Sequence, residues 1–324
     1  MTQKLPPSAM PGALPEDPAD GSRVFDRDLL RRRRDRAAPG FAAHDFLKRE
    51  VGARLAERLG DVKRDFPLAL DLGAHDGTLA ELLAGVNGIE TLVHADLSPA
   101  MCRAAASRGL RAVAADEEAL PFAAGRFDLA VSALSLHWVN DLPGALLQLN
   151  RVLKPDGLFL GAMIGGRSLS DLRAAFMEAE IVVTGGAAPR VAPMVEVRDA
   201  GALLQRAGFA LPVADSDRLT VTWPDPLTAM RELRGMGEGN ALLARHPAPL
   251  RREVLLHAAS LWLDRAADAD GRLAVEFEIV WLTGWHPDAS QQVPLRPGSA
   301  KARLADALGT DEHPLPGQGR GLQH

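Results

Sequence analysis

Short apolar runs alternate with helix-patterned segments along the first half of the chain. Residues 67–72 form a nearly continuous apolar run, which is typical of a strand buried in a parallel sheet. Residues 44–60 place leucine or valine every four positions, which predicts an amphipathic helix. This alternation predicts an α/β domain with a doubly wound sheet. Further strands are expected at 90–96, 110–115, 126–134 and 157–164, and further helices at 78–86, after Ser98, and at 142–153.

The second half of the chain is richer in helical patterns. Residues 226–267 are helical in pattern, interrupted by a glycine-rich stretch, and predict an insert or lid. At 273–281 apolar side chains alternate strictly with other residues, which predicts a half-buried strand. We therefore expect a seven-stranded sheet with the helical insert before its last strand. The remaining helices are expected at 168–186 and 197–208, and strand material at 209–215 and 218–223.

The two ends of the chain differ in composition from its middle. Residues 1–22 are rich in proline, alanine and acids and predict a disordered tail. Residues 287–324 return to proline, glycine and charge and predict a mostly disordered tail. One domain is expected over 23–286.

Composition and charge exclude several classes of function. The net charge of −5 argues against nucleic acid as the main partner. Cys102 is the only cysteine, so disulfide frameworks and cysteine-based metal sites are excluded. No apolar run reaches the ~18 residues that a membrane-spanning helix needs. The N-terminal segment resembles neither a secretory signal nor a transit peptide, so we expect a cytoplasmic, bacterial protein without a transmembrane segment.

The turn after the strand at 67–72 carries the first candidate site. A dinucleotide fingerprint would require glycines where His75 and Thr78 stand, so that motif fails. The spacing of Asp71, Gly73, His75 and Gly77 instead resembles the acid-x-Gly-x-Gly-x-Gly motif of class I S-adenosylmethionine (SAM) methyltransferases, with His75 replacing the middle glycine. Asp71 can attract the ammonium group of SAM, and backbone N–H groups at the helix start can receive its carboxylate.

Two further acids stand at expected strand ends. Asp96 ends the second strand, where a carboxylate can accept hydrogen bonds from both ribose hydroxyls. Asp116 follows the third strand and can accept from the adenine amino group, while the backbone N–H of Glu117 can meet a ring nitrogen. Leu97 and Leu134, at the tips of the second and fourth strands, complete the predicted cofactor site.

Two histidines offer other chemistry. His94 and Asp96 form an H-x-D pair, half of a two-histidine, one-carboxylate iron site, but no distal histidine is indicated by spacing. We therefore assign no metal site. His137 follows the fourth strand beside Trp138 and is the candidate general base. Trp138 could equally be a core side chain under a lid, and a lone histidine is more often structural than catalytic.

Residues 24–38 are unusually basic and helical in pattern. One interpretation is an exposed helix whose charges are solvated. The other is a functional helix that closes over the cofactor pocket or docks an acidic partner, because guanidinium groups suit carboxylate recognition.

Several segments together resemble the complex I assembly factor 5 family over residues 24–300. They include residues 25–29, 116–122, 134–143, 153–157 and 233–240, with Gly284-Trp285 and residues 297–300. The chain is more distantly similar to malonyl-carrier-protein methyltransferases of biotin synthesis. The resemblance implies a class I methyltransferase fold, SAM as cofactor, and the site residues named above.

The resemblance also implies a protein substrate, namely a complex I subunit, reached in the cytoplasm or at the inner face of the membrane. Three functions stay open. The first is a SAM-dependent methyltransferase. The second, described for the mitochondrial member of the family, is hydroxylation of an arginine on a complex I subunit. The third is a non-catalytic SAM-binding assembly chaperone.

Overall fold

The computed structural model describes residues 23–292 and 304–311. Of these, residues 23–288 belong to one compact unit and the later ones to a second. The predicted tail at 1–22 lies outside the described residues. The predicted tail at 287–324 is described in part, and that part includes a short helix, α10 (Leu304–Leu308). The candidate site lies in the first unit.

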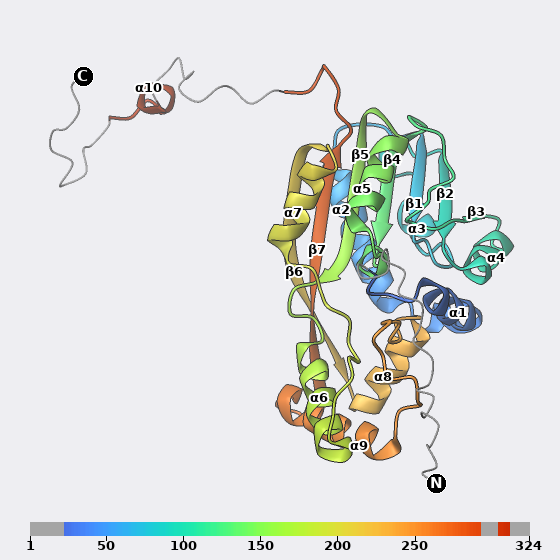
Figure 1. The fold of residues 1–324 in the computed structure, drawn as a ribbon. Helices are drawn as coiled ribbons and strands as arrows, with labels where there is room; N and C mark the ends of the chain where they lie inside the picture. Colours follow the sequence, from blue (N-terminus) through green and yellow to red (C-terminus); the bar gives the residue numbers. More distant parts are fainter. Residues whose placement is uncertain (1–22, 293–303, 312–324) are drawn as a thin grey trace, which may run out of the picture. The chain divides into compact units, whose positions relative to one another are not determined.

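The first unit is built on one mixed sheet of seven strands (Figure 1). The strands are β1 (Leu68–Leu72), β2 (Thr91–Asp96), β3 (Arg111–Ala114), β4 (Phe127–Ala133), β5 (Leu153–Gly165), β6 (Ala210–Trp223) and β7 (Leu273–Trp285). Their order is β3-β2-β1-β4-β5-β7-β6, and only β7 runs antiparallel to its neighbours. This topology confirms the predicted fold class. The order reverses between β1 and β4, and ligands bind beside such a switch point in open α/β sheets.

Helices cover both faces of the sheet. They are α1 (Arg27–Ala37), α2 (Phe46–Gly60), α3 (Leu79–Leu82), α4 (Pro99–Ser107), α5 (Leu142–Val152), α6 (Ser170–Thr184), α7 (Val197–Arg206), α8 (Pro226–Gly235) and α9 (Arg252–Ala266). Alternate residues of β4 point to opposite faces. Leu129 and Val131 join the core that contains α2, whereas Ala130 joins the core that contains α5 and α7. Because both faces of these parallel strands are buried, their sequences are apolar runs.

The helical insert lies between β6 and β7, as predicted, but it is less helical than the pattern indicated. It consists of α8 and α9, and the segment 236–251 between them is not helical. Gly237 in that segment has a positive φ of +85°, which ends the helical path. The same segment runs beside the start of α1, where Phe25 and Leu242 form an antiparallel bridge.

Two predicted elements have different bounds in the structure. The helix expected at 78–86 is reduced to α3, because Gly85 and Asn87 take left-handed backbone conformations with φ of +73° and +45°. The strands expected at 209–215 and 218–223 form one continuous strand, β6. It pairs with β7 along nearly its whole length, and the pairing register shifts once, between Ala210 and Val213.

Candidate functional site

The turn after β1 is tightly folded against its neighbours. Gly73 has a φ of +71°, and a Cβ atom there would overlap the side chain of Ser135. The N–H groups of Gly73 and Ala74 both donate to the carbonyl of Ala95, at 2.8 and 3.0 Å. The turn is thereby tied to β2, and at Gly73 only a glycine satisfies both the conformation and the space.

His75 takes the left-handed conformation (φ +53°) at the position where the resembling motif has a glycine. Its backbone N–H donates to Asp96 Oδ2 at 2.9 Å, and its ring stacks on Phe41 with centroids 4.9 Å apart. Burial lowers the pKa of His75 well below its ordinary value, helped by the positive charges of Lys48 and Arg34. The ring is therefore neutral at pH 7, and its Nδ1 lies 3.0 Å from the carbonyl oxygen of Gly73.

Asp71 lies beneath the turn and is fully buried. Its Oδ2 is 3.0 Å from Nδ1 of His94 on the neighbouring strand β2. Its Oδ1 is buried and has no hydrogen-bond partner among the described residues. A buried carboxylate oxygen without a partner is energetically costly, so Asp71 is suited to receive a cationic donor.

Asp96, at the end of β2, is held by two backbone donors. Its Oδ1 accepts from the N–H of Ser98 at 2.8 Å, and its Oδ2 accepts from that of His75. Burial raises the pKa of Asp96, although the charge of Arg34 opposes that rise. Nη1 of Arg34 lies 3.6 Å from Asp96 Oδ2.

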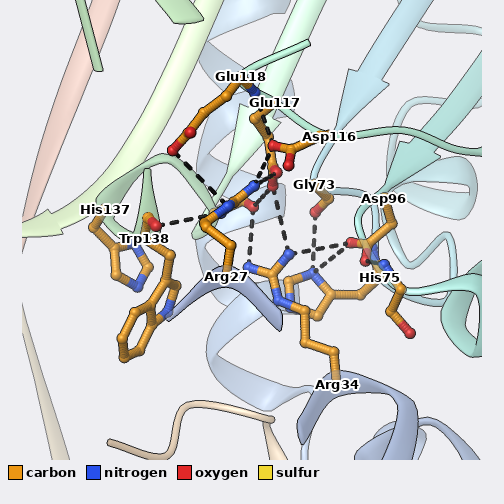
Figure 2. Close-up of polar contacts among 12 residues, drawn as sticks. Arg27, Arg34, Gly73, His75, Asp96, Asp116, Glu117, Glu118, His137 and Trp138 are labelled. Atoms are coloured by element: carbon orange, nitrogen blue, oxygen red, sulfur yellow. Dashed lines mark hydrogen bonds and ion pairs between the residues drawn. The ribbon is translucent and has the colours of Figure 1, made fainter. Parts of the chain in front are cut away.

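The segment after β3 adds two more acids, and both meet arginines from α1 (Figure 2). Asp116 Oδ1 accepts from Arg27 Nη2 at 2.6 Å, and Glu117 also accepts from Arg27. Glu117 Oε1 accepts from the hydroxyl of Ser135 at 2.7 Å and from Arg34 at 3.5 Å. Burial alone would raise the pKa of Glu117, but the charges of Arg27 and Arg34 lower it to about 2. Glu117 is therefore ionised at neutral pH, and its side chain, rather than its backbone N–H alone, is part of the site.

Three of the predicted cofactor residues lie at the margin of this acidic group. Gly77 has a φ of +83°, but a Cβ there would overlap Leu110, so this glycine serves the packing of the turn against the start of β3. Leu97 is partly buried against the small apolar cluster that contains Phe25 and Trp138. Leu134 lies at the end of β4 and lines a neighbouring pocket.

That pocket lies on the other side of His75 and Leu134. Its empty volume of about 370 Å³ includes open solvent, and the room left between its walls is about that of one water molecule. Apolar side chains dominate its walls, with one carboxylate, Glu238, from the segment after α8. The lining residues are Phe41, His44, Leu47, Lys48, His75, Leu134, Ile164, Leu233, Met236 and Glu238.

His137, the predicted base, is bonded to Glu238. The distance from His137 Nε2 to Glu238 Oε2 is 3.2 Å, and the indole N–H of Trp138 donates to the same oxygen. Because a carboxylate only accepts, His137 Nε2 carries the hydrogen, and Nδ1 is the ring nitrogen that does not face Glu238. Nδ1 is buried without a partner among the described residues. Burial alone would raise the pKa of Glu238, but the hydrogen bonds from His137 and Trp138 and the charge of Arg34 hold it below its ordinary value.

The iron-site alternative loses its support in this arrangement. His94 faces Asp71, whereas Asp96 faces His75, Ser98 and Arg34. In the part of the chain that the structure describes, no three side chains of the metal-ligating types converge. Over the same residues, none of the helices has both the length and the apolar character needed to cross a membrane.

Comparison with known proteins places the chain among methyltransferases. Residues 70–161 match the family described as "Methyltransferase domain". A protein of Danio rerio named "Arginine-hydroxylase NDUFAF5, mitochondrial" is 43% identical over 290 residues, which cover 88% of this chain and 90% of that protein. The chain belongs to the NDUFAF5 family. This finding confirms the resemblance that the motifs indicated.

Two more distant proteins extend the comparison. A malonyl-[acyl-carrier protein] O-methyltransferase of Methylovorus is 32% identical over 282 residues, covering 84% of this chain and 93% of that one. Phosphoethanolamine N-methyltransferase 2 of Haemonchus contortus, solved in complex with SAM, aligns with a TM-score of 0.51 at 17% identity, over 81% of this chain and 60% of that one. This structural likeness concerns the fold alone. The chain therefore has the class I methyltransferase fold.

The site of this NDUFAF5-family chain suits SAM in most respects. Asp71 Oδ1 lacks a partner that an ammonium group would supply, and the acids Asp96 and Asp116 stand at the ends of neighbouring strands. Two guanidinium groups are exceptions, because Arg27 already donates to Asp116 and Arg34 lies between Asp96 and Glu117.

Four residues of the site were missed as individual site residues at the level of sequence. Arg27 and Arg34 lie two helical turns apart on α1, and this shared face was the available signal. Glu238 stands in the glycine-rich interruption of the insert, a composition that marks a non-helical segment. No local pattern indicated Ser135.

Proposed function

We propose that this protein binds SAM at the tips of β1, β2 and β3 and methylates a protein partner. The observation that supports the proposal is the position of Asp71, Asp96 and Asp116, which stand in or just after the adjacent strands β1, β2 and β3, with the Gly73 turn following the first of them. This edge of the sheet lies beside the switch point between β1 and β4. Asp71 Oδ1 would accept from the ammonium group, Asp96 from the ribose and Asp116 from the adenine amino group.

The chain's residues would chiefly align the acceptor. SAM, when bound, would supply an activated methyl group, and its sulfur would keep the electron pair of the carbon–sulfur bond that breaks. The apolar pocket beside His75 and Leu134 would hold the acceptor side chain and exclude water. Since Glu238 holds His137 Nε2–H, Nδ1 of His137 would take the proton that the acceptor loses. Neutral His75 would not repel a sulfonium cation.

A second candidate function is hydroxylation of a protein arginine. It is favoured by the 43% identity to a relative named arginine-hydroxylase. The partner in both cases would be a subunit of respiratory complex I, met at the inner face of the membrane in a bacterial cytoplasm. The non-catalytic alternative is an assembly chaperone that binds SAM without turnover.

One experiment separates these functions. The full chain is incubated, in air and with a chemical reductant that supplies the two electrons of a hydroxylation by dioxygen, with SAM carrying a deuterated methyl group and with purified complex I subunits. The subunits are then analysed by mass spectrometry. Transfer of the deuterated methyl group supports the methyltransferase, and gain of one oxygen atom on an arginine supports the hydroxylase. An unmodified partner, together with SAM binding in calorimetry, supports the chaperone. Absence of SAM binding would overturn the proposal.

A further inference from the structure

Arg34 is an unusual arginine because its whole side chain is buried, with none of it exposed to solvent. Its Nη2 donates to the hydroxyl of Ser135 at 3.1 Å, and its Nη1 lies 3.5 Å from Glu117 and 3.6 Å from Asp96. The guanidinium thus lies among residues to which the proposed function gives the adenosine. Figure 2 shows it entering from α1 toward this acidic group.

Arg34 and a bound ribose would compete for Asp96. A guanidinium offers planar N–H donors to carboxylates, and the hydroxyls of a ribose offer donors to the same acceptor, whereas the proposed adenine acceptor, Asp116, pairs with Arg27. Building on the proposed function, we propose that Arg34 is an internal occupant of the cofactor site, which must withdraw before an adenosyl ligand can bind. Arg34 then acts as an autoinhibitory plug that keeps the buried acids paired when no cofactor is bound.

The start of α1 is attached to the segment that carries Glu238. The N–H of Asp26 donates to the carbonyl of Ala241 at 2.7 Å, and Asp26 Oδ2 lies 2.9 Å from Arg245 Nη2. A Cβ at Gly237 would lie 3.3 Å from Arg34 Cγ, so the backbone of this segment touches the stem of Arg34. Withdrawal of Arg34 therefore disturbs the segment that places Glu238 against His137. Cofactor entry and assembly of the acceptor pocket are coupled through these contacts.

The test compares the full-length protein with Arg34→Ala and with Arg32→Ala, which changes an exposed arginine of the same helix. Calorimetry measures the affinity for S-adenosylhomocysteine. Because the competing guanidinium is lost, Arg34→Ala should bind S-adenosylhomocysteine more tightly than the unchanged protein. The gain should lie between roughly 5-fold and 150-fold, the range typical of coupled equilibria. Arg32→Ala should bind as the unchanged protein does.

Low-millimolar ethylguanidinium chloride provides a second readout. In Arg34→Ala it should refill the space, raise the melting temperature and weaken binding of S-adenosylhomocysteine. Equal sodium chloride should do neither, and Arg32→Ala should not respond. If ethylguanidinium strengthened binding, or if Arg34→Ala bound equally or more weakly, Arg34 would be part of the cofactor-bound site and the plug would be wrong.

The plug and the proposed function fail in different ways. If the unchanged protein binds and Arg34→Ala gains nothing, the plug falls and the proposed function stands. If only Arg34→Ala binds, both stand. If neither folded protein binds S-adenosylhomocysteine, both fall. Should Arg34→Ala not fold, Arg34→Lys replaces it in the affinity comparison, since an ammonium group cannot reach both carboxylates and Ser135 with a planar fork.

Discussion

The cofactor side and the acceptor side of this site are built in different ways. The cofactor side comes from strand tips and turns within residues 71–117, and backbone donors and buried charges hold it in place. The acceptor side is a largely apolar pocket whose walls come from residues 41–48, from His75 and Leu134 after β1 and β4, from the end of β5, and from α8 with the segment after it. The cofactor side depends on backbone geometry that tolerates little change, whereas the acceptor side depends on side-chain packing, which neighbouring side chains can partly restore by shifting. Changes on the cofactor side should therefore have the larger effects.

The strongest test of that difference is at the turn after β1. We expect Gly73→Ala to lower the free energy of unfolding by about 2–5 kcal/mol, the sum of left-handed strain and overlap with Ser135. Gly85→Ala is the matched control, because Gly85 has a similar φ of +73° but no atom lies within 4 Å of the position that a Cβ would take there. It should cost about 1 kcal/mol. Urea unfolding measures both losses. If they were equal, the turn after β1 would accommodate the added methyl group without overlap, contrary to the expectation.

The buried charges of the cofactor side predict a pH dependence. The pKa of Glu117 is about 2 in the folded chain against an ordinary value of 4.5, so its stabilising contribution is present above pH 4.5 and is lost as the pH falls toward 2. The loss should amount to roughly 3 kcal/mol. Urea unfolding between pH 6 and pH 3 should show a weaker dependence in Glu117→Gln. The exposed control Glu50→Gln should keep it, and an unchanged slope in Glu117→Gln would contradict the assignment.

Asp96→Asn tests the ribose position directly. We expect weaker binding of S-adenosylhomocysteine by about 1.5 kcal/mol, the low end for a hydrogen bond to a charged group. We expect the low end because the variant also removes the negative charge that attracts Arg34, and Arg34 then competes less with the ligand. Calorimetry measures the change, with Asp28→Asn, whose side chain is 77% exposed, as the control. Equal affinities would remove Asp96 from the cofactor site.

The acceptor side should respond least. Trp138→Phe removes the N–H that donates to Glu238 and should lower the free energy of unfolding by about 1 kcal/mol. Trp281→Phe is the matched control, because the buried Trp281 Nε1 has no hydrogen-bond partner among the described residues. The difference between the two variants in urea unfolding reports the hydrogen bond. A larger loss in free energy of unfolding from Trp138→Phe than from Gly73→Ala would contradict the expectation that the cofactor side is the more sensitive.

Much of the fold was predictable because it follows from local patterns. The apolar runs of β1 and β4 and the alternation in β7 reflect which faces are buried, and the structure confirms the predicted sheet. The helix expected at 78–86 was too long because Asn87 and Gly85 leave the helical path, and a side-chain pattern does not encode that departure.

The basic segment shows where prediction from sequence stopped. Its sequence pattern did not distinguish between two interpretations, an exposed helix and a helix that closes over the pocket. In the structure Arg34 is buried and Arg27 is mostly buried, whereas Arg32 is exposed. Helical spacing relates Arg27 to Arg34, but it contains no information on the acids that they meet.

The sequence by itself determined the order of strands and helices, the glycine turn and the acids at the strand tips, because each depends on residues close together in the chain. Tertiary structure alone decided the pairing of Arg34 with Glu117 and of His137 with Glu238. These partners are 83 and 101 residues apart. Their hydrogen bonds form only after the sheet has assembled and the insert has packed, and no local propensity records such contacts.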